Sequence, residues 1–269
     1  MRLSQLHPLI YEARVRQLRL ERDLGDRLAR VPFARGSSGS PLPFAMVRHR
    51  SLLRRRLGSS DPRLQETKIV NLGLAAAALD GLLIHPGEVA SFWERVGPPT
   101  AARGFVEGLL LAGGEVRSGV GGGLCQASNL LYWMALHAPL AVVERHRHGF
   151  DPFPDEGRVL PFGSGATVFY NYVDLRLANP TDQTFQLRVW VSRTHLCGML
   201  LTERAWPLSY HVEERAHRFL RDATGRVYRE NELWRTTIDR RTGALAKTEL
   251  VARNHCEVKY PVSADMLAG

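Results

Sequence analysis

The 269-residue sequence has few cysteines, few lysines and no long hydrophobic run. Its three cysteines, Cys125, Cys197 and Cys256, are far apart and odd in number, so they do not form a disulfide framework. The sequence has no C-x-x-C pair, which argues against a structural zinc site made of thiolates. It also lacks a secretory signal and an apolar segment long enough to span a bilayer. We therefore expect no transmembrane segment and a cytoplasmic protein, while action outside the cell stays open.

The positive charge is concentrated at the N-terminus. Residues 1–70 contain 15 Arg or Lys against 6 Asp or Glu, whereas the other 199 residues contain 21 of each kind. Only three of the 36 basic residues are lysine, a ratio typical of a GC-rich genome rather than of a surface selected for phosphate. No nucleic-acid partner is therefore expected.

Residues 8–30 are typical of a basic amphipathic helix, with Leu9, Val15, Leu18 and Leu28 roughly on one face. This apolar face is thin, so we expect an N-terminal helix that docks on the rest of the protein. The alternative is contact with an anionic membrane surface, which basic amphipathic helices can provide.

The later elements predict an α+β fold. Asp61-Pro62 resembles the start of a helix that continues to Leu79, and residues 106–116 resemble a hairpin. After a helix that begins at Cys125, strand patterns cover residues 141–148, 166–177 and 185–191 and shorter pieces up to Tyr260. We expect N-terminal helices and a nucleophile-bearing helix packed on a mainly antiparallel sheet.

The most informative segment is the motif GGGLCQ at residues 121–126, followed by an apolar run over residues 130–136. Cys125 is thereby placed after a glycine turn and in the first turn of a predicted helix. Unpaired N–H groups and the helix dipole favour a thiolate there, and the glycines let N–H groups point at an oxyanion. Beside this candidate nucleophile, the candidate substrate-binding residues are Gly122, Gly123, Gln126, Ser128 and Asn129. The alternatives are a buried structural cysteine and a phosphate loop, which is disfavoured because no Lys-Ser or Lys-Thr follows.

Glu144, His146 and His148 alternate along a predicted strand, so their side chains would share one face. Either histidine could take the proton of the Cys125 thiol, which makes both candidate catalytic bases, with Glu144 as a candidate substrate-binding residue. A solvated edge strand is the alternative. Zinc held by the two histidines and one thiolate is a further possibility, but spacing gives no fourth ligand, so neither a metal nor another cofactor is expected.

A second glycine-rich turn, PFGSGATV at residues 161–168, leads into another predicted strand. It forms either a simple chain reversal or a wall of the site, where Ser164 and Thr167 would bind substrate through hydrogen bonds. The candidates for the acid that fixes the histidine tautomer are Asp151, Asp155 and Asp174, and the sequence does not separate them.

Together these segments resemble the VanW family, named for an accessory protein of vancomycin-resistance gene clusters. The resemblance rests on HPGE at residues 85–88, GGGLCQASNLLYWMALHAPL from Gly121, ERHRHGFDPFPD from Glu144 and PFGSGATVFYNYVDLRLANPT from Pro161. It divides the chain into a basic helical extension and linker (1–47), a core domain (48–200) and C-terminal strands that complete or flank the core (201–269).

The resemblance implies peptidoglycan chemistry. Membrane-anchored relatives are associated with cross-linking of the L,D-transpeptidase type that uses the cysteine of the glycine motif. Carried over, Cys125 would attack the carbonyl before a terminal D-Ala, and the partner would be a peptidoglycan stem peptide or wall precursor. This chain departs from those relatives in lacking an anchor and in having Gly165 where they have an aspartate. Trimming of soluble precursors, non-catalytic binding of wall precursors or glycopeptides, and a zinc-dependent hydrolase therefore remain as alternatives.

Overall fold

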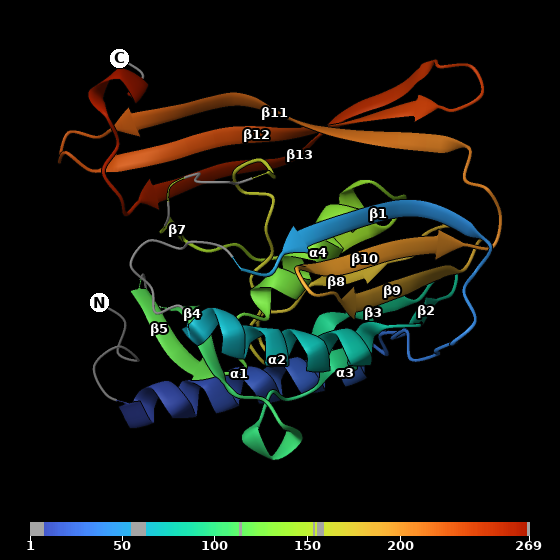
Figure 1. The fold of residues 1–269 in the computed structure, drawn as a ribbon, viewed down its shortest axis with the longest axis horizontal. Helices are drawn as coiled ribbons and strands as arrows, with labels where there is room; N and C mark the ends of the chain where they lie inside the picture. Colours follow the sequence, from blue (N-terminus) through green and yellow to red (C-terminus); the bar gives the residue numbers. More distant parts are fainter. Residues whose placement is uncertain (1–7, 55–62, 113–114, 153, 155–158, 268–269) are drawn as a thin grey trace.

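The computed structural model describes residues 8–54, 63–112, 115–152, 154 and 159–267. The helices are α1 (Pro8–Leu28), α2 (Arg63–Leu79), α3 (Phe92–Val96) and α4 (Cys125–Leu136), with short 3-10 turns at Ala101–Arg103 and Ala264–Met266. The strands are β1 (Phe44–Leu52), β2 (Leu83–Ile84), β3 (Val89–Ser91), β4 (Glu107–Ala112), β5 (Glu115–Val120), β6 (Ala141–Glu144), β7 (Phe150–Asp151), β8 (Arg176–Ala178), β9 (Phe185–Val191), β10 (His195–Thr202), β11 (Leu208–Arg221), β12 (Val227–Asp239) and β13 (Leu245–Val258). This arrangement confirms the predicted α+β fold (Figure 1).

The central sheet carries the helix that begins at Cys125. Its strands are antiparallel and follow the order β1-β10-β9-β2. Gly198 in β10 lets α4 lie directly on the sheet, because a Cβ there would meet Leu130 and Met134 of α4 at 2.9 and 2.8 Å. The predicted packing of the helix that begins at Cys125 on an antiparallel sheet is therefore confirmed, while the role of Cys125 as a nucleophile stays a prediction.

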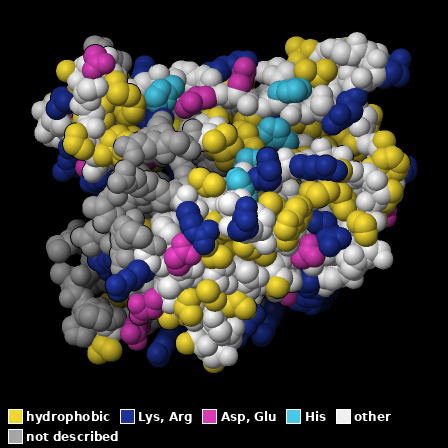
Figure 2. Space-filling view, viewed as in Figure 1, with side chains coloured by type: hydrophobic (Ala, Val, Ile, Leu, Met, Phe, Trp, Pro, Cys, Tyr) yellow, Lys and Arg dark blue, Asp and Glu magenta, His cyan; other side chains and the backbone are white. Residues whose placement is uncertain are grey.

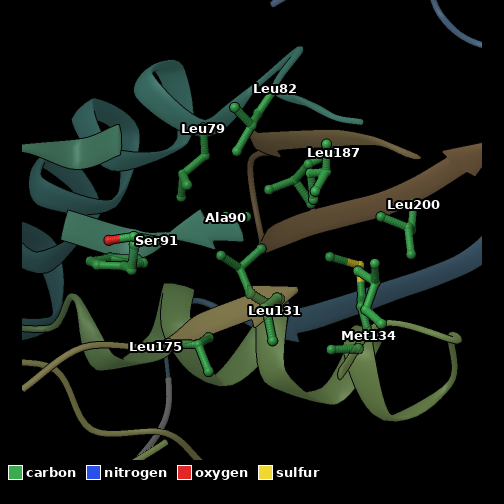
Figure 3. A pocket seen from close by; sticks show the side chains of 14 residues that line it. Leu79, Leu82, Ala90, Ser91, Leu131, Met134, Leu175, Leu187 and Leu200 are labelled. Atoms are coloured by element: carbon green, nitrogen blue, oxygen red, sulfur yellow. The ribbon is translucent and has the colours of Figure 1, made fainter. Parts of the chain in front are cut away.

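The hydrophobic core lies where α2, α4 and the central sheet meet. Leucines from α2, α4, β9 and β10 converge there with Met134 and leave an apolar cavity of about 20 Å³ (Figure 3). A cavity of this size and lining stays dry, because water needs polar partners. It is a packing gap rather than a ligand site.

A second sheet is built from the C-terminal strands and lies above the body (Figure 1), with the order β11-β12-β13-β7. One attachment of this sheet to the rest of the chain is β7, which pairs with β13 in parallel, and Arg147 adds hydrogen bonds to Arg253 and Asn254 of β13. Asp151 of β7 forms an ion pair with Arg229 of β12 at 3.2 Å, and both side chains are 3% exposed. Tyr260 donates a further hydrogen bond to Asp151 at 3.0 Å.

Two predicted strands are shorter than expected. The segment predicted at 141–148 is a strand only to Glu144, and the segment predicted at 166–177 becomes a strand only at Arg176. Between these points the two segments meet through an isolated pairing of His146 with Thr167. The reason is that residues 163–168 bond to side chains of α4 and to Arg145 instead of to a continuous ladder.

Helix α1 is docked by polar side chains rather than by the predicted apolar face. Arg22 makes two hydrogen bonds to Glu144, at 2.5 and 2.7 Å, and Asp26 makes two to Arg176, at 2.6 and 2.5 Å. Leu9 and Leu28, predicted to share a face with Val15 and Leu18, are exposed. That part of the prediction is wrong, because ion pairs decide which side of α1 meets the body. Within the described ranges, no helix is long and apolar enough to cross a membrane.

Candidate functional site

Cys125 is the first residue of α4, which confirms its predicted place in the first turn of a helix. Its side chain is half-buried. Its Sγ lies 4.0 Å from the carbonyl oxygen of Val168, so the segment after the second glycine turn covers the sulfur. The backbone N–H groups of Gly123, Leu124 and Cys125 donate no hydrogen bond to any other residue that the structure describes. Of these three donors, the Cys125 N–H faces its own sulfur, whereas those of Gly123 and Leu124 have no such bond. Available donors at a helix start are what an oxyanion site requires.

Burial raises the pKa of the Cys125 thiol, whereas the sequence predicted a thiolate. Backbone hydrogen bonds at Val168 and at Cys125 itself act in the opposite direction, but desolvation is the larger effect. The free energy of hydration that a thiolate loses under the covering segment exceeds the stabilisation that it gains from the N–H groups at the helix start. The resting side chain is therefore a neutral thiol, and a base must remove its proton during any attack.

The glycines of the motif serve close packing within the protein. The backbones of Gly122 and Gly108 touch, so that a Cβ at either position would overlap the other residue. Gly123 has a φ of +90° and leaves no room for a Cβ beside the buried Lys68 side chain. The Asn71 amide also donates to the carbonyl of Gly122 at 2.9 Å. The sequence suggested that these glycines let a ligand approach the backbone closely. In the structure, residues of α2 and β4 occupy that space.

The three polar residues after Cys125 bond to neighbouring segments. Gln126 donates to Ser51 and to the Leu52 carbonyl at 2.9 Å each, which ties α4 to β1. Ser128 donates to the Ala166 carbonyl at 2.6 Å, and Asn129 accepts from the Ala166 amide at 2.6 Å. These contacts position the segment that covers Cys125. Their proposed contact with a substrate stays a prediction.

His146 and Glu144 form a carboxylate–histidine pair. His146 Nε2 lies 2.9 Å from Glu144 Oε1, and the His146 side chain is 45% exposed. Although burial acts to raise the pKa of Glu144, hydrogen bonds from Arg22 and His146 hold it below its usual value. The structure shows Glu144 bonded to His146, and its predicted contact with a substrate stays a prediction.

His148 has a different environment from His146. Its ring lies 6.4 Å from that of Phe150, and its carbonyl accepts a hydrogen bond from the Cys256 thiol at 3.5 Å. Burial lowers the pKa of His148 to about 4. Because the strand ends at Glu144, the alternation that predicted a shared face does not extend to His148. A buried ring with so low a pKa is a weak base at neutral pH.

Cys125 is connected to His146 only indirectly, through the backbone of Thr167 and Val168. In the part of the chain that the structure describes, no hydrogen bond or ring contact joins Cys125 to His146 or His148. The link is the pairing of His146 with Thr167, the residue before Val168, at 2.8 Å between the Thr167 amide and the His146 carbonyl. Their catalytic roles therefore stay predictions.

Of the remaining predicted residues, Thr167 lies near Cys125, and the others that the structure describes bond elsewhere in the fold. The Thr167 hydroxyl is buried and finds no partner among the described residues, whereas Ser164 bonds within its own turn to Pro161 at 2.6 Å. Asp174 is fully buried and binds Ser91 and Arg176, and Asp151 is engaged in the second sheet. Neither orients His146, and Asp155 lies outside the described residues. Glu144 has the orienting role for which these aspartates were considered.

The structure also shows contributors that the sequence did not reveal. Arg22 reaches Glu144 across 122 positions of sequence, and Arg145 holds the carbonyls of Gly163 and Gly165 while lying 4.7 Å above the Tyr132 ring. Local patterning gives no signal for Arg22. Among the residues described, no three or more His, Cys, Asp or Glu side chains are arranged to hold a metal ion.

Comparison with known proteins bears on this geometry. A family model described as VanW like protein matches residues 67–201. The chain is also 30% identical over 261 residues to the vancomycin B-type resistance protein VanW of Enterococcus faecalis, and the alignment covers 97% of this chain and 94% of that protein. The chain belongs to the VanW family.

The VanW match includes Cys125, His146 and Thr167 and ends within β10, so α1 and the strands β11, β12 and β13 lie outside it. A second relative, the uncharacterized protein YoaR of Bacillus subtilis, is 34% identical over 119 residues, which are 44% of this chain and 37% of that protein. No solved structure matches.

Proposed function

We propose that this VanW-family protein performs cysteine-dependent acyl transfer or hydrolysis on peptidoglycan stem peptides. The observation that carries the proposal is the geometry at the start of α4. There the Cys125 sulfur lies beside unpaired backbone N–H groups, under a segment that pairs with the oriented His146. A nucleophile, an oxyanion site and a base held by an acid are the parts that acyl transfer needs.

Cys125 acts as the nucleophile in the first half of the reaction. Its Sγ attacks the carbonyl carbon before a terminal D-Ala, and the thiol proton passes to Nδ1 of His146, since Nε2 faces Glu144. The N–H groups of Leu124 and Cys125 bind the oxyanion. The C–N bond then breaks, the departing amine takes the proton from His146, and a thioester remains on Cys125.

The second half of the reaction restores the enzyme. An amine of another stem peptide, or water, attacks the thioester carbonyl and gives its proton to His146. The carbon–sulfur bond breaks, and the proton returns to the sulfur. Because the resting thiol is neutral, each half needs the base, and Glu144 stabilises His146 while it carries the proton.

The substrate class rests on the family. The Enterococcus relative is named for resistance to vancomycin, which supports a substrate from cell-wall metabolism. The same substrate class is implied by the resemblance of the GGGLCQ motif to wall-modifying relatives.

The test is release of D-Ala from a synthetic stem tetrapeptide, followed by mass spectrometry of the protein for an acyl adduct on Cys125. The parent protein is expected to release D-Ala and to carry the adduct, and Cys125→Ala to do neither. Cys197→Ala, at a buried cysteine of β10, is the matched control and is expected to keep activity. Undiminished release by Cys125→Ala would refute the proposal.

A second candidate function is non-catalytic binding of wall precursors or glycopeptides. It is favoured by the raised pKa of Cys125 and by the use of Gln126, Ser128 and Asn129 in holding the fold. This function predicts that Cys125→Ser binds a stem peptide as tightly as the parent in calorimetry, with no D-Ala released by either protein. Turnover by the parent would exclude it.

A further inference from the structure

Two buried asparagines face each other in the C-terminal sheet. Asn231 of β12 is paired in register with Asn254 of β13, and each residue is 2% exposed. The Asn254 amide donates to Asn231 Oδ1 at 2.8 Å, and the Asn231 amide donates to Glu214. Directly paired residues of an antiparallel sheet have their side chains on the same face, so both amides lie on one side of it. A buried amide is costly unless it is hydrogen-bonded, so the remaining bonds of this pair show what it holds.

The pair contacts the second glycine turn. Asn231 Nδ2 donates to the Phe162 carbonyl at 2.7 Å. Gly163 packs directly on the Asn254 amide, because a Cβ at this glycine would lie 2.1 Å from Asn254 Cγ. The backbone that leaves this turn is the segment that covers the Cys125 sulfur. The start of the cover is therefore held by two side chains of the C-terminal sheet.

The same pair holds the segment of the candidate base. Arg147, the residue after His146, donates to Asn254 Oδ1 at 3.0 Å. The His146 carbonyl accepts a hydrogen bond from the Thr167 amide in the covering segment at 2.8 Å. Asn254 thus contacts both backbone segments that meet near Cys125, one through Arg147 and the other through the turn.

The C-terminal sheet packs closely on the body. Figure 2 shows the side chains of the upper sheet against those of the body across the middle of the view, where histidine side chains gather, although the ribbons are separated in Figure 1. Arg235 of β12 donates to the Ala138 carbonyl, just beyond α4, at 3.3 Å. The strands β11, β12 and β13 lie outside the residues that the VanW family model matches. Side chains from outside the matched region therefore contact the surroundings of Cys125.

We propose that Asn231 and Asn254 are positioning residues for the site at Cys125. They fix the two backbone segments that meet over the sulfur, so the cover and the backbone of His146 keep one relative placement. Reacting groups need supporting hydrogen bonds of this kind, because catalysis tolerates misplacement of only about 0.5 Å. The role rests on the proposed function, since it is the alignment of Cys125 with His146 that the pair serves.

The experiment measures the rate at which iodoacetamide alkylates Cys125 in the folded full chain, read by peptide mass spectrometry. N254A should raise this rate at least about fivefold, because loss of buried hydrogen bonds increases the population of locally open states. The pH at half-maximal rate should decrease, since burial under the cover raises the pKa of the thiol. R147Q changes an exposed side chain, should keep the fold, and should act in the same direction.

Two controls separate a local effect from general loosening of the protein. Cys197, which is 5% exposed in β10, should be alkylated no faster in N254A than in the parent. N179A removes another buried asparagine, whose amide donates to the Ile84 and Gln183 carbonyls. This variant should leave the alkylation rate of Cys125 unchanged.

Unchanged alkylation of Cys125 in N254A, or in R147Q if N254A does not fold, would overturn the proposal. So would equal acceleration at Cys125 and Cys197. Absence of D-Ala release by the parent would refute only the proposed function, because alkylation reports the placement of the cover without turnover. If the parent turns over, N254A should lower kcat with little change in KM, as expected for misplaced reacting groups.

Discussion

Replacement of His148 by glutamine is expected to remove a large part of the acid sensitivity of the fold. His148 is half-buried, with its ring 6.4 Å from that of Phe150, and burial lowers its pKa from 6.5 to about 4. Between these two pH values His148 is protonated in the unfolded chain and neutral in the folded chain. Stability therefore falls as the pH decreases through 6.5 and levels off near 4, and it is fully present above 6.5.

The magnitude follows from that interval. Each pKa unit is worth about 1.4 kcal/mol, so His148 alone should cost about 3 kcal/mol at full protonation and about 2 kcal/mol at pH 5. His49 and His137, whose pKa values are also lowered by burial, act in the same direction. The informative quantity is therefore the difference between the parent and His148→Gln in how much stability each loses on acidification.

The assay is urea unfolding followed by tryptophan fluorescence at pH 7.5 and pH 5.0. His148→Gln should lose about 2 kcal/mol less than the parent between these conditions. The control is His195→Gln, at the first residue of β10 with its ring bonded to Thr194, which should lose as much as the parent. Equal losses in His148→Gln and the parent would refute the conclusion that His148 is buried in its neutral form.

Gly122→Ala should lower the free energy of unfolding by about 2 kcal/mol or more, because a Cβ overlaps the Gly108 backbone. Gly25→Ala, with open space on α1, should be neutral or gain up to about 1 kcal/mol in the same urea titration. Alkylation of Cys125 by iodoacetamide should reach half its maximal rate at a higher pH than in a short peptide, and a lower midpoint would contradict the neutral thiol. Glu144→Ala should cost about 2 kcal/mol in thermal unfolding, since it leaves the partly buried Arg22 guanidinium without its carboxylate.

The sequence predicted the elements that depend on local spacing. The start of α4 at Cys125 follows from glycines placed before a continuous apolar run, and the α2 helix and the β4–β5 hairpin follow from equally local patterns. The α+β class and the packing of α4 on an antiparallel sheet come from the order of such elements. These parts need no knowledge of distant contacts.

The electrostatics of the site depended on contacts that the sequence does not display. The Cys125 thiol was predicted from its helix, but its pKa is controlled by a segment at Val168 that covers it. The exposed side of α1 was misassigned because Arg22 bonds to Glu144, 122 residues away. Desolvation and long-range ion pairs are tertiary effects, and local periodicity contains no measure of either.

One carboxylate, that of Glu144, has two partners that belong to different parts of the protein. It holds Arg22 of α1 through two hydrogen bonds and His146 of the candidate site through one. Attachment of the N-terminal helix and the position of the His146 ring are therefore linked through one side chain. A force that lifts α1 from the body removes two hydrogen bonds that fix the Glu144 carboxylate, and so loosens the ring that this carboxylate holds. By reciprocity, a ligand that draws the His146 ring away from Glu144 changes how firmly α1 is held.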